Sequence, residues 1–523
     1  MELENVSQIE HATHVSRVEL FRLGTALIFV VGVMLYSGMS VGQVPNGYML
    51  VVAAMIGGYM AINIGANDVA NNVGPAVGSK AITLTGAIMI AVVFETAGAL
   101  IAGGEVVGTI KKGIIDPALI PNSDAFIWLM MAALLAGAIW LNIATALGAP
   151  VSTTHSIVGG VLGAGIAAGG LGIADWNKVG QIAASWVISP VMGGVIAAGF
   201  LYFIKRTITY RGEKMAASAA VIVPFLIAIM AWAFSTYLIL KGLKKIWATD
   251  FLSALAWGAA AGVIVYILVR PVVAKKIVQI SNDKQGVNRL FIVPLICAAA
   301  LLSFAHGAND VANAVGPLAA INDAILQGAI NSKAAIPIWV MLVGAMGIAV
   351  GLALYGPKLI RTVGTEITEL DQMRAFCIAL AAAITVIIAT NFGLPVSSTH
   401  VAVGGIFGVG FLREYLKTTY SKMELDIQHH YHGKDEAEVE AYLVKFKLAS
   451  INEKSQMLKE LKAHTGNMEL TKKERRRLKG VYRHELVKRS HLLKIVTAWL
   501  VTVPLSGLMA ALLFYTIRGM MLP

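Results

Sequence analysis

The stretch "GANDVANNVGP" at residues 65–75 places one carboxylate and three amides at the end of a long apolar segment. Its surroundings belong to a membrane protein. The 523 residues are 57% hydrophobic and only 14% charged, whereas soluble domains carry about 25% charged residues. The sequence therefore predicts that Asp68 lies inside a bilayer, where an ionised carboxylate costs at least about 2.5–3.5 kcal/mol and usually marks a functional site with a partner.

The hydropathy pattern predicts an all-α polytopic membrane protein with about 11 to 13 transmembrane helices, because many apolar runs reach the length that a spanning helix needs. Two further apolar pieces, 150–170 and 395–411, are rich in glycine and start on proline, so we expect broken helices or re-entrant hairpins there. The predicted spans lie near 23–42, 48–66, 80–103, 125–147, 180–204, 217–240, 251–270, 290–307, 335–357, 372–392 and 491–515.

Both polar motifs occur twice. "GANDVANNVGP" at 65–75 returns as "GANDVANAVGP" at 307–317, and "GAPVSTTHSIVGG" at 148–160 returns as "GLPVSSTHVAVGG" at 393–405. The offsets are 307 − 65 = 242 and 393 − 148 = 245, so the motifs recur in the same order at nearly the same spacing. The chain is therefore an internal duplication.

The net charge of +12 is concentrated in loops, as the positive-inside rule requires, which argues against a nucleic-acid partner. With a cytoplasmic N-terminus, seven crossings separate the two repeats, so we expect inverted repeats, a common plan for secondary transporters. The predicted parts are an N-terminal segment with an extra span (1–45), transport repeat 1 (46–205), linker spans (206–289), transport repeat 2 (290–411 and 491–515) and a hydrophilic cytoplasmic insert (413–490).

The GAND motifs predict a cation site. Asp68 and Asp310 hold equivalent positions, and each has asparagines one residue before and three residues after it. We expect Gly65 and Gly307 to let the chain leave helical geometry, and the Gly-Pro pair that follows to end a short helix. Carboxylate and amide oxygens suit Na⁺ or a proton rather than a soft transition metal. The alternative is that Asn and Asp only cap a broken helix, which two matched copies inside apolar sequence make less favourable. The candidate Na⁺ ligands are Asp68, Asn71, Asp310 and Asn313.

The motifs "PVSTTH" and "PVSSTH" predict an anion site. Each places proline at an expected first helical position, so that free backbone N–H groups and three hydroxyls lie at a positive helix end. Neither motif contains lysine or arginine, which suits an anion that must be released again. Hydroxyls that bond back to their own helix are the alternative. The candidate phosphate ligands are Ser152, Thr153, Thr154, Ser397, Ser398 and Thr399.

Three further residues are candidates for coupling. His155 and His400 close the hydroxyl motifs, where they either carry a proton or brace the loop through a backbone hydrogen bond. Glu95 lies in an apolar run without an acid at the matching place of the second half, so it is either another cation or proton site or a buried structural hydrogen-bonding group. Two aspartates and a phosphate cannot share a low-dielectric site unpaired, so cations must enter with the anion.

At these four motifs the sequence resembles the inorganic phosphate transporter family of sodium- or proton-coupled symporters. The resemblance implies inverted repeats, a possible homodimer, phosphate between the two hydroxyl motifs, and cations at the two aspartates. It places Asn67 and Asn309 beside the cations and among the phosphate ligands, and it matches Glu95 to a glutamate of the family in a "FET" context. The charged block 413–490 has no counterpart in the family pattern.

The predicted function is phosphate uptake with Na⁺ by alternating access, in a bacterial inner (plasma) membrane, with no cofactor other than the coupling ion. Alternatives are a proton-coupled phosphate or metal–phosphate symporter, a sulfate permease of the same family, and a passive anion channel. An enzyme is not expected, because a hydrolase built on Ser152 and His155 would lack the third member of its triad.

Overall fold

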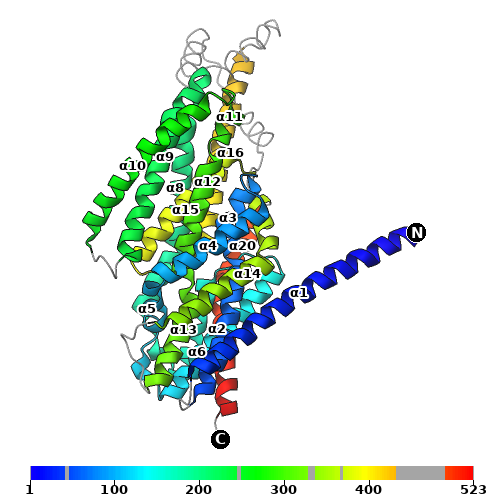
Figure 1. The fold of residues 1–523 in the computed structure, drawn as a ribbon, viewed down its shortest axis with the longest axis vertical. Coiled ribbons are helices and arrows are strands. Elements are labelled where there is room, and N and C mark those ends of the chain that lie inside the picture. Colours follow the sequence, from blue (N-terminus) through cyan, green and yellow to red (C-terminus); the bar gives the residue numbers. More distant parts are fainter. Residues whose placement is uncertain are drawn as a thin grey trace.

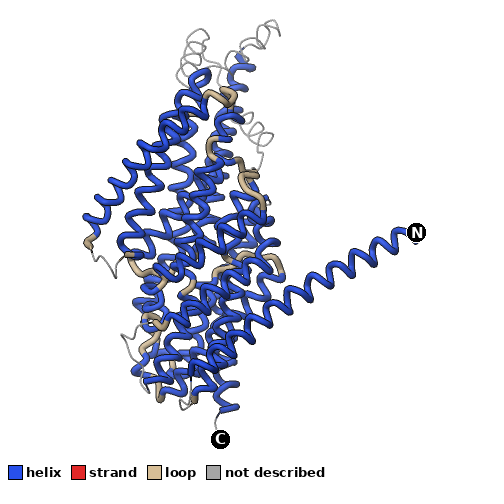
Figure 2. Tube along the Cα trace, in the orientation of Figure 1, coloured by secondary structure: helices blue, strands red, loops and turns tan. Residues whose placement is uncertain are grey.

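The computed structural model describes residues 2–41, 46–243, 249–327, 336–365, 369–430 and 489–521. These residues are almost entirely helical (Figure 2), and the only β-type pairing among them is an isolated bridge between Ile115 and Ala174. Within the described ranges, 11 helical segments are long and apolar enough to cross a membrane. The prediction of an all-α polytopic membrane protein is confirmed.

Most helices form one elongated bundle, from which the N-terminal part of α1 (Glu2–Val41) extends sideways (Figure 1). The first half contains α2 (Gly47–Asn67), α3 (Val69–Gly78), α4 (Leu84–Ala102), α5 (Gly104–Lys112), α6 (Ser123–Ala146), α7 (Thr153–Gly169) and α8 (Trp176–Thr207). Two connecting helices follow, α9 (Met215–Tyr237) and α10 (Phe251–Ile277). The second half contains α11 (Lys284–Arg289), α12 (Ile292–Asp310), α13 (Ala312–Gln327), α14 (Ile338–Thr365), α15 (Gln372–Asn391), α16 (Ser398–His430) and α20 (Arg489–Met521). Of the predicted insert, residues 431–488 lie outside the described residues.

The GAND motifs do not unwind at their glycines, so that prediction is wrong. α2 runs through Gly65, and even Asp68, between α2 and α3, keeps helical dihedral angles (φ −82°, ψ −39°). A side chain at Gly65 would collide with the carbonyl oxygen of Ile348, and one at Gly307 with the carbonyl oxygen of Glu95. These glycines therefore permit close helix packing, as small residues do in membrane proteins.

The prolines of both motif types also behave differently from the expectation. Pro75 and Pro317 lie inside α3 and α13 instead of ending them. In the hydroxyl motif the proline precedes the helix, and a serine is the N-cap. Ser152 Oγ accepts a hydrogen bond from the His155 N–H at 3.1 Å, and Ser397, its counterpart just before α16, accepts one from the His400 N–H at 3.2 Å. A serine cap is the stronger helix start, because its oxygen satisfies a backbone donor that proline cannot serve.

The two halves interlock through matching contacts. α2 packs on α14 and α12 on α4, while α7 packs on α20 and α16 on α8, so each pair joins one half to the other. Small residues sit at equivalent places in these interfaces. Gly163 of α7 faces the backbone of Gly507, and Gly408 of α16 faces the backbone of Gly194. The sequence duplication is thus matched by a duplication of packing contacts.

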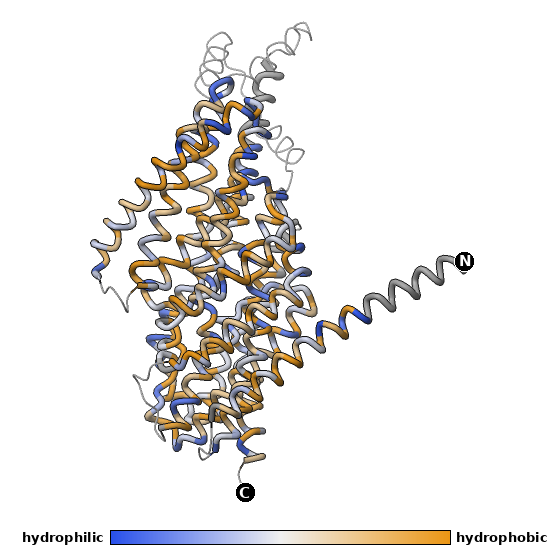
Figure 3. Tube along the Cα trace, viewed as in Figure 1, coloured by the Kyte–Doolittle hydropathy of each residue, from blue (hydrophilic) through white to orange (hydrophobic). Residues whose placement is uncertain are grey.

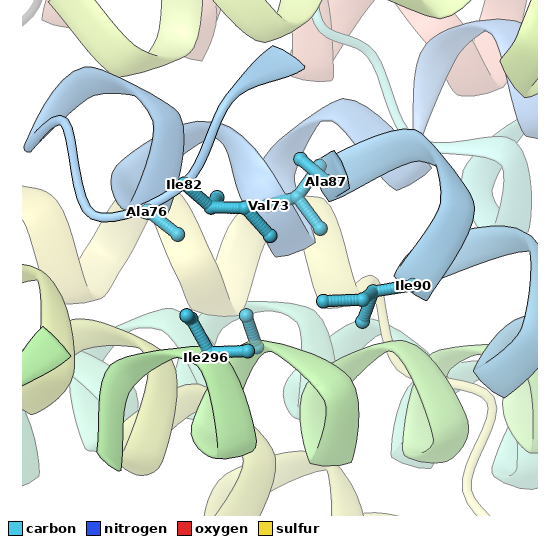
Figure 4. Close-up of a pocket in the computed structure, with 7 residues that line it drawn as sticks. Val73, Ala76, Ile82, Ala87, Ile90 and Ile296 are labelled. Carbon is cyan, nitrogen blue, oxygen red and sulfur yellow. The ribbon is translucent and has the colours of Figure 1, made fainter. Parts of the chain in front are cut away.

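The outer helices expose apolar side chains, as expected for a lipid-facing surface; on α10, Ile264, Ile267 and Leu268 are largely exposed. Hydrophobic segments dominate the middle of the bundle, and hydrophilic ones gather toward its upper end (Figure 3). A void of about 10 Å³ beside α3 has room for about one water molecule. It is lined by Val73, Ala76, Ile82, Ala87, Ile90, Ile296 and Ala299 (Figure 4), so it cannot hold an anion.

Candidate functional site

The Asp68 carboxylate joins the two hydroxyl motifs. Its Oδ2 accepts a hydrogen bond from Thr153 Oγ1 at 2.6 Å, and its Oδ1 accepts one from Thr399 Oγ1 at 3.0 Å. Thr153 opens α7 in the first half, and Thr399 lies in the first turn of α16 in the second half. All three side chains are buried. The α2–α3 junction therefore places one carboxylate between two helix N-termini.

Two equivalent asparagines extend this network. Asn71 Nδ2 donates to Thr399 Oγ1 at 2.9 Å, and Asn313 Nδ2 donates to Thr153 Oγ1 at 3.0 Å and to Thr154 Oγ1 at 3.3 Å. Each asparagine thus contacts the hydroxyl motif of the opposite half. The GAND motif of each half is therefore joined by hydrogen bonds to the hydroxyl motif of the other half, so the network contains residues from both copies.

The second aspartate is held similarly but not identically. Asp310 Oδ2 accepts from Ser398 Oγ at 2.9 Å, and its Oδ1 accepts from Asn309 Nδ2 at 2.7 Å. Asn309 also donates to the carbonyl of Val396 at 2.8 Å. In the first half, Asn67 binds the start of its own hydroxyl motif and the segment before it: its Nδ2 donates to Thr145 Oγ1 and the Ala149 carbonyl, and its Oδ1 accepts from the Val151 N–H.

Three ionisable groups meet at the centre. One ligand atom each from Asp68, His306 and Asp310 lies within 4.8 Å of the others, and all three side chains are buried. The amide oxygens Asn71 Oδ1 and Asn309 Oδ1 are also buried and have no hydrogen-bond partner within the described part of the chain. Buried acceptors without donors are costly. Carboxylate and free amide oxygens together form a donor set that suits a hard cation such as Na⁺.

Comparisons with known proteins identify the family of the chain. The model of the "Phosphate transporter family" matches residues 64–510, a range that includes both motif pairs. The chain belongs to the phosphate transporter family. Several relatives carry the name "Putative phosphate permease", and two of them illustrate the similarity. One, from Helicobacter pylori (strain J99), is 53% identical over 98% of both chains; the other, from Chlamydia trachomatis, is 38% identical over 70% of this chain and 90% of its own.

A solved structure described as "The sodium-dependent phosphate transporter" superposes with a TM-score of 0.73 at 30% identity. The match covers 91% of this chain and 100% of the other. This phosphate transporter family member is therefore a multi-pass membrane transporter and not an enzyme, and its bacterial relatives are consistent with the plasma membrane.

Nearly all of the predicted site residues lie in one region of this transporter, but they differ in which groups they contact. Ser152 and Ser397 face their own helices as caps. Thr153, Thr399 and Ser398 donate to the aspartates, whereas Thr154 donates to the Val396 carbonyl at 3.3 Å. Glu95 reaches the site only through His306. Asn72, which has no amide counterpart in the second half, donates to Glu95 Oε1 at 2.8 Å and not to an aspartate.

His306 is the site residue that the sequence analysis missed. Its Nδ1 lies 2.6 Å from Glu95 Oε2, and its Nε2 lies 2.7 Å from Asp310 Oδ2. Despite the short distance, Nε2 makes no hydrogen bond within the described part of the chain. When the ring is protonated, it can offset one of the two carboxylates. The sequence offered one signal: "NIGAND" in the first half becomes "AHGAND" in the second, so His306 replaces Ile64.

The histidine and the glutamate make the two halves of the site unequal. Gly307 packs against Glu95 just as Gly65 packs against Ile348, so Glu95 and Ile348 are equivalent positions. Near Asp68, the position equivalent to His306 is therefore occupied by Ile64, and the position equivalent to Glu95 by Ile348. Asp68 lacks a comparable buried chain of ionisable groups. The two carboxylates are chemically different sites despite their identical motifs.

The histidines of the hydroxyl motifs belong to an aromatic cluster, in which they meet edge to face and His400 stacks on a tryptophan. The His155 ring lies 3.8 Å from Trp186 and 4.3 Å from His400, measured between centroids, and His400 stacks on Trp499 at 3.6 Å. Trp186 Nε1 donates to the Pro395 carbonyl at 3.3 Å. Neither ring nitrogen of His400 has a hydrogen-bond partner within the described residues. This geometry favours a bracing role through the ring faces.

We expect His400→Phe to retain phosphate uptake and His400→Ala to raise the KM for phosphate, because phenylalanine keeps the stack and alanine removes it. An offset aromatic contact is worth about 0.5–1.5 kcal/mol, and this ring makes two. Initial uptake rates measured across a series of phosphate concentrations and pH values would check this. A phenylalanine variant without uptake, or with an altered pH profile, would instead assign a proton-carrying role to His400.

Proposed function

We propose that the chain takes up inorganic phosphate together with Na⁺ by alternating access. One observation carries the proposal: the hydroxyls best placed to bind phosphate, those of Thr153 and Thr399, donate to the Asp68 carboxylate. The anion donors and the cation ligand are therefore the same small network. Binding of a cation to Asp68 must therefore alter the hydroxyls that are available to the anion.

The coupling follows from the hydrogen-bond inventory. A threonine hydroxyl has one proton to donate, so it cannot serve Asp68 and phosphate at the same time. A Na⁺ ion at the Asp68 and Asp310 carboxylates, with the free oxygens of Asn71 and Asn309 nearby, would satisfy the carboxylate oxygens that now accept those hydrogen bonds. The hydroxyls could then turn toward phosphate. Cation binding thereby creates the anion site.

Charge balance supports the same order of events. Asp68, Asp310 and Glu95 lie around the centre, and His306 is the one side chain among the contacts described above that can carry a positive charge. A phosphate mono- or dianion added to this site would leave several negative charges unpaired, which a buried site does not tolerate. The name of the solved relative, which describes it as sodium-dependent, favours Na⁺ as the compensating ion.

Alternating access is the transport mode that we infer from the duplication. All of the motif side chains are buried, so phosphate cannot reach them from either side unless helices move. The interlocked halves place the four motifs at a shared centre, and repeats that rock around a central site are the common solution in secondary transporters. Inverted orientation of the repeats is part of this proposal.

The deciding experiment is uptake of labelled phosphate into proteoliposomes that contain the purified chain. We expect accumulation above equilibrium with an inward Na⁺ gradient, little uptake with an inward proton gradient alone, and no inhibition by excess sulfate. Uptake driven by protons would keep the site and change the ion. Competition by sulfate would indicate a broader anion permease, and purely downhill flux would indicate a channel.

The hydroxyl network gives a sharper prediction. We expect Thr153→Val and Thr399→Val each to raise the KM for phosphate about 10- to 100-fold, since a hydrogen bond to a charged group is worth about 1.5–3 kcal/mol. Thr385→Val is the matched control, because the buried Thr385 hydroxyl donates only to the Ala381 carbonyl in its own helix. Equal KM values in the site variants and the control would remove these hydroxyls from the anion site.

A further inference from the structure

Four cationic side chains from four helices converge away from the central site. They are Lys205 in the last turn of α8, Lys284 at the start of α11, Arg374 in the first turn of α15 and Arg413 in α16. We call these four residues the basic cluster. The labels of α11 and α16 lie toward the upper end of the bundle (Figure 1), the end that charge counting assigns to the cytoplasm.

Three of the four cations share their acceptors. Lys284 Nζ lies 3.8 Å and Arg374 Nε 3.3 Å from the same oxygen, Asp371 Oδ2. Arg374 Nη1 and Arg413 Nη1 both donate to the backbone carbonyl of Glu369, at 3.1 and 2.8 Å. The Glu369 carboxylate is 91% exposed and lies 3.8 Å from Arg413 Nη2, so solvent screens it. The ion pairs that the described residues form with these cations thus involve two carboxylates, those of Asp371 and Glu369.

Lys205 is the cation without an acid. Among the described residues no carboxylate oxygen lies within 4 Å of its Nζ, which lies 5.9 Å from the centroid of the Tyr210 ring. The charged groups that act on it are Arg374, Lys284 and Arg413, which repel it, and Asp371, which attracts it. The side chain is nevertheless half-buried. A partly desolvated cation among like charges requires an anion from elsewhere.

The positive-inside rule alone does not explain this arrangement. That rule requires cations on one side of the membrane, and exposed residues satisfy it, as Lys275 and Lys276 do in the last turn of α10. It does not require cations from separate helices to meet. In the basic cluster, Arg413 is only 9% exposed and the Arg374 side chain 13%, so both arginines are held in fixed positions by the packing of α15 and α16.

We propose that the basic cluster binds a phosphate group, either of free phosphate or of an anionic lipid headgroup. Arginine forks match the oxygens of a phosphate group, and lysines add point charges that need no fixed geometry. The site lies at the end of membrane helices, where anionic headgroups gather. It is distinct from the Asp68 site, because Ser398 and Arg413 are separated by about 22 Å along α16 at 1.5 Å per residue.

The test uses the purified full chain in nanodiscs of phosphatidylcholine alone or of equal parts phosphatidylcholine and phosphatidylglycerol, in Na⁺-free buffer. Retained phosphatidylglycerol is counted by native mass spectrometry, and the thermal midpoint is measured with and without inorganic phosphate. Lys205→Gln/Arg413→Gln is compared with Lys275→Gln/Lys276→Gln, which removes the same charge from the same predicted side. Lys205→Gln alone breaks no ion pair described above, so it decides the matter if the double variant does not fold.

For the wild type and the α10 control we expect tight retention of at least one phosphatidylglycerol or a phosphate-dependent rise in the midpoint, and for the cluster variants about a tenfold weaker effect. Retained lipid without a phosphate effect identifies the headgroup as the ligand. A phosphate effect in pure phosphatidylcholine that the cluster variants lose identifies the free anion. Equal behaviour of cluster and control variants would overturn the proposal and reduce the cluster to a general topology signal.

Discussion

Asp68→Asn should abolish phosphate accumulation. The carboxylate accepts hydrogen bonds from Thr153 and Thr399, and an amide in its place carries no charge for a cation and offers one oxygen instead of two. Removing one partner of a buried ion pair costs about 3–5 kcal/mol, which corresponds to a loss of more than about 100-fold. Initial rates of Na⁺-driven uptake into proteoliposomes measure the effect.

Asp124→Asn is the matched control, because Asp124 lies in the first turn of α6, outside the network. We expect this variant to transport normally after reconstitution at equal density. The site assignment fails if Asp68→Asn is folded in the membrane and still accumulates phosphate to a level near that of the wild type.

Gly307→Ala should prevent the bundle from assembling. A Cβ at this position would collide with the backbone carbonyl of Glu95, and backbone cannot escape by a change of rotamer. α12 and α4 would have to separate, which disturbs the Glu95–His306 contact as well. Overpacking commonly costs about 1–3 kcal/mol, and more where nothing can yield. We expect aggregated protein, or a strongly lowered thermal midpoint in detergent.

Gly180→Ala tests whether any glycine would behave this way. Nothing lies within 4 Å of a Cβ built at Gly180 in α8, so alanine there should be neutral or slightly stabilising, by up to about 1 kcal/mol. A normal midpoint and a monodisperse elution profile for Gly307→Ala would show that α12 and α4 do not pack as closely as described.

The sequence predicted the membrane class, the spans and most site residues because these features are either long or repeated. An apolar run of 20 residues has few alternatives, and the paired motifs identify Asp68, Asp310 and the hydroxyls without any knowledge of contacts. The same reliance on repetition hid His306. It occurs in one half only, so a search for what the halves share passes over it.

The glycines were misjudged for a different reason. Gly65 can serve unwinding or close packing, and the local sequence is the same in both cases. The residue that decides between them is Ile348, which is far away in the chain and known only from the fold. The start of the helix in the hydroxyl motifs was misplaced in a similar way. Proline was expected at the first helical position, but Ser152 is the N-cap and the proline lies before the helix.

The exchange of helices between the two halves has a consequence for biogenesis. α16 packs on α8 and α20 packs on α7, so the first half leaves the ribosome with packing faces whose partners have not yet been synthesised. Its glycine surfaces must remain in lipid until the second half is inserted. The halves expressed as separate polypeptides should therefore each be degraded when produced alone and accumulate when produced together, because each supplies the missing neighbours of the other.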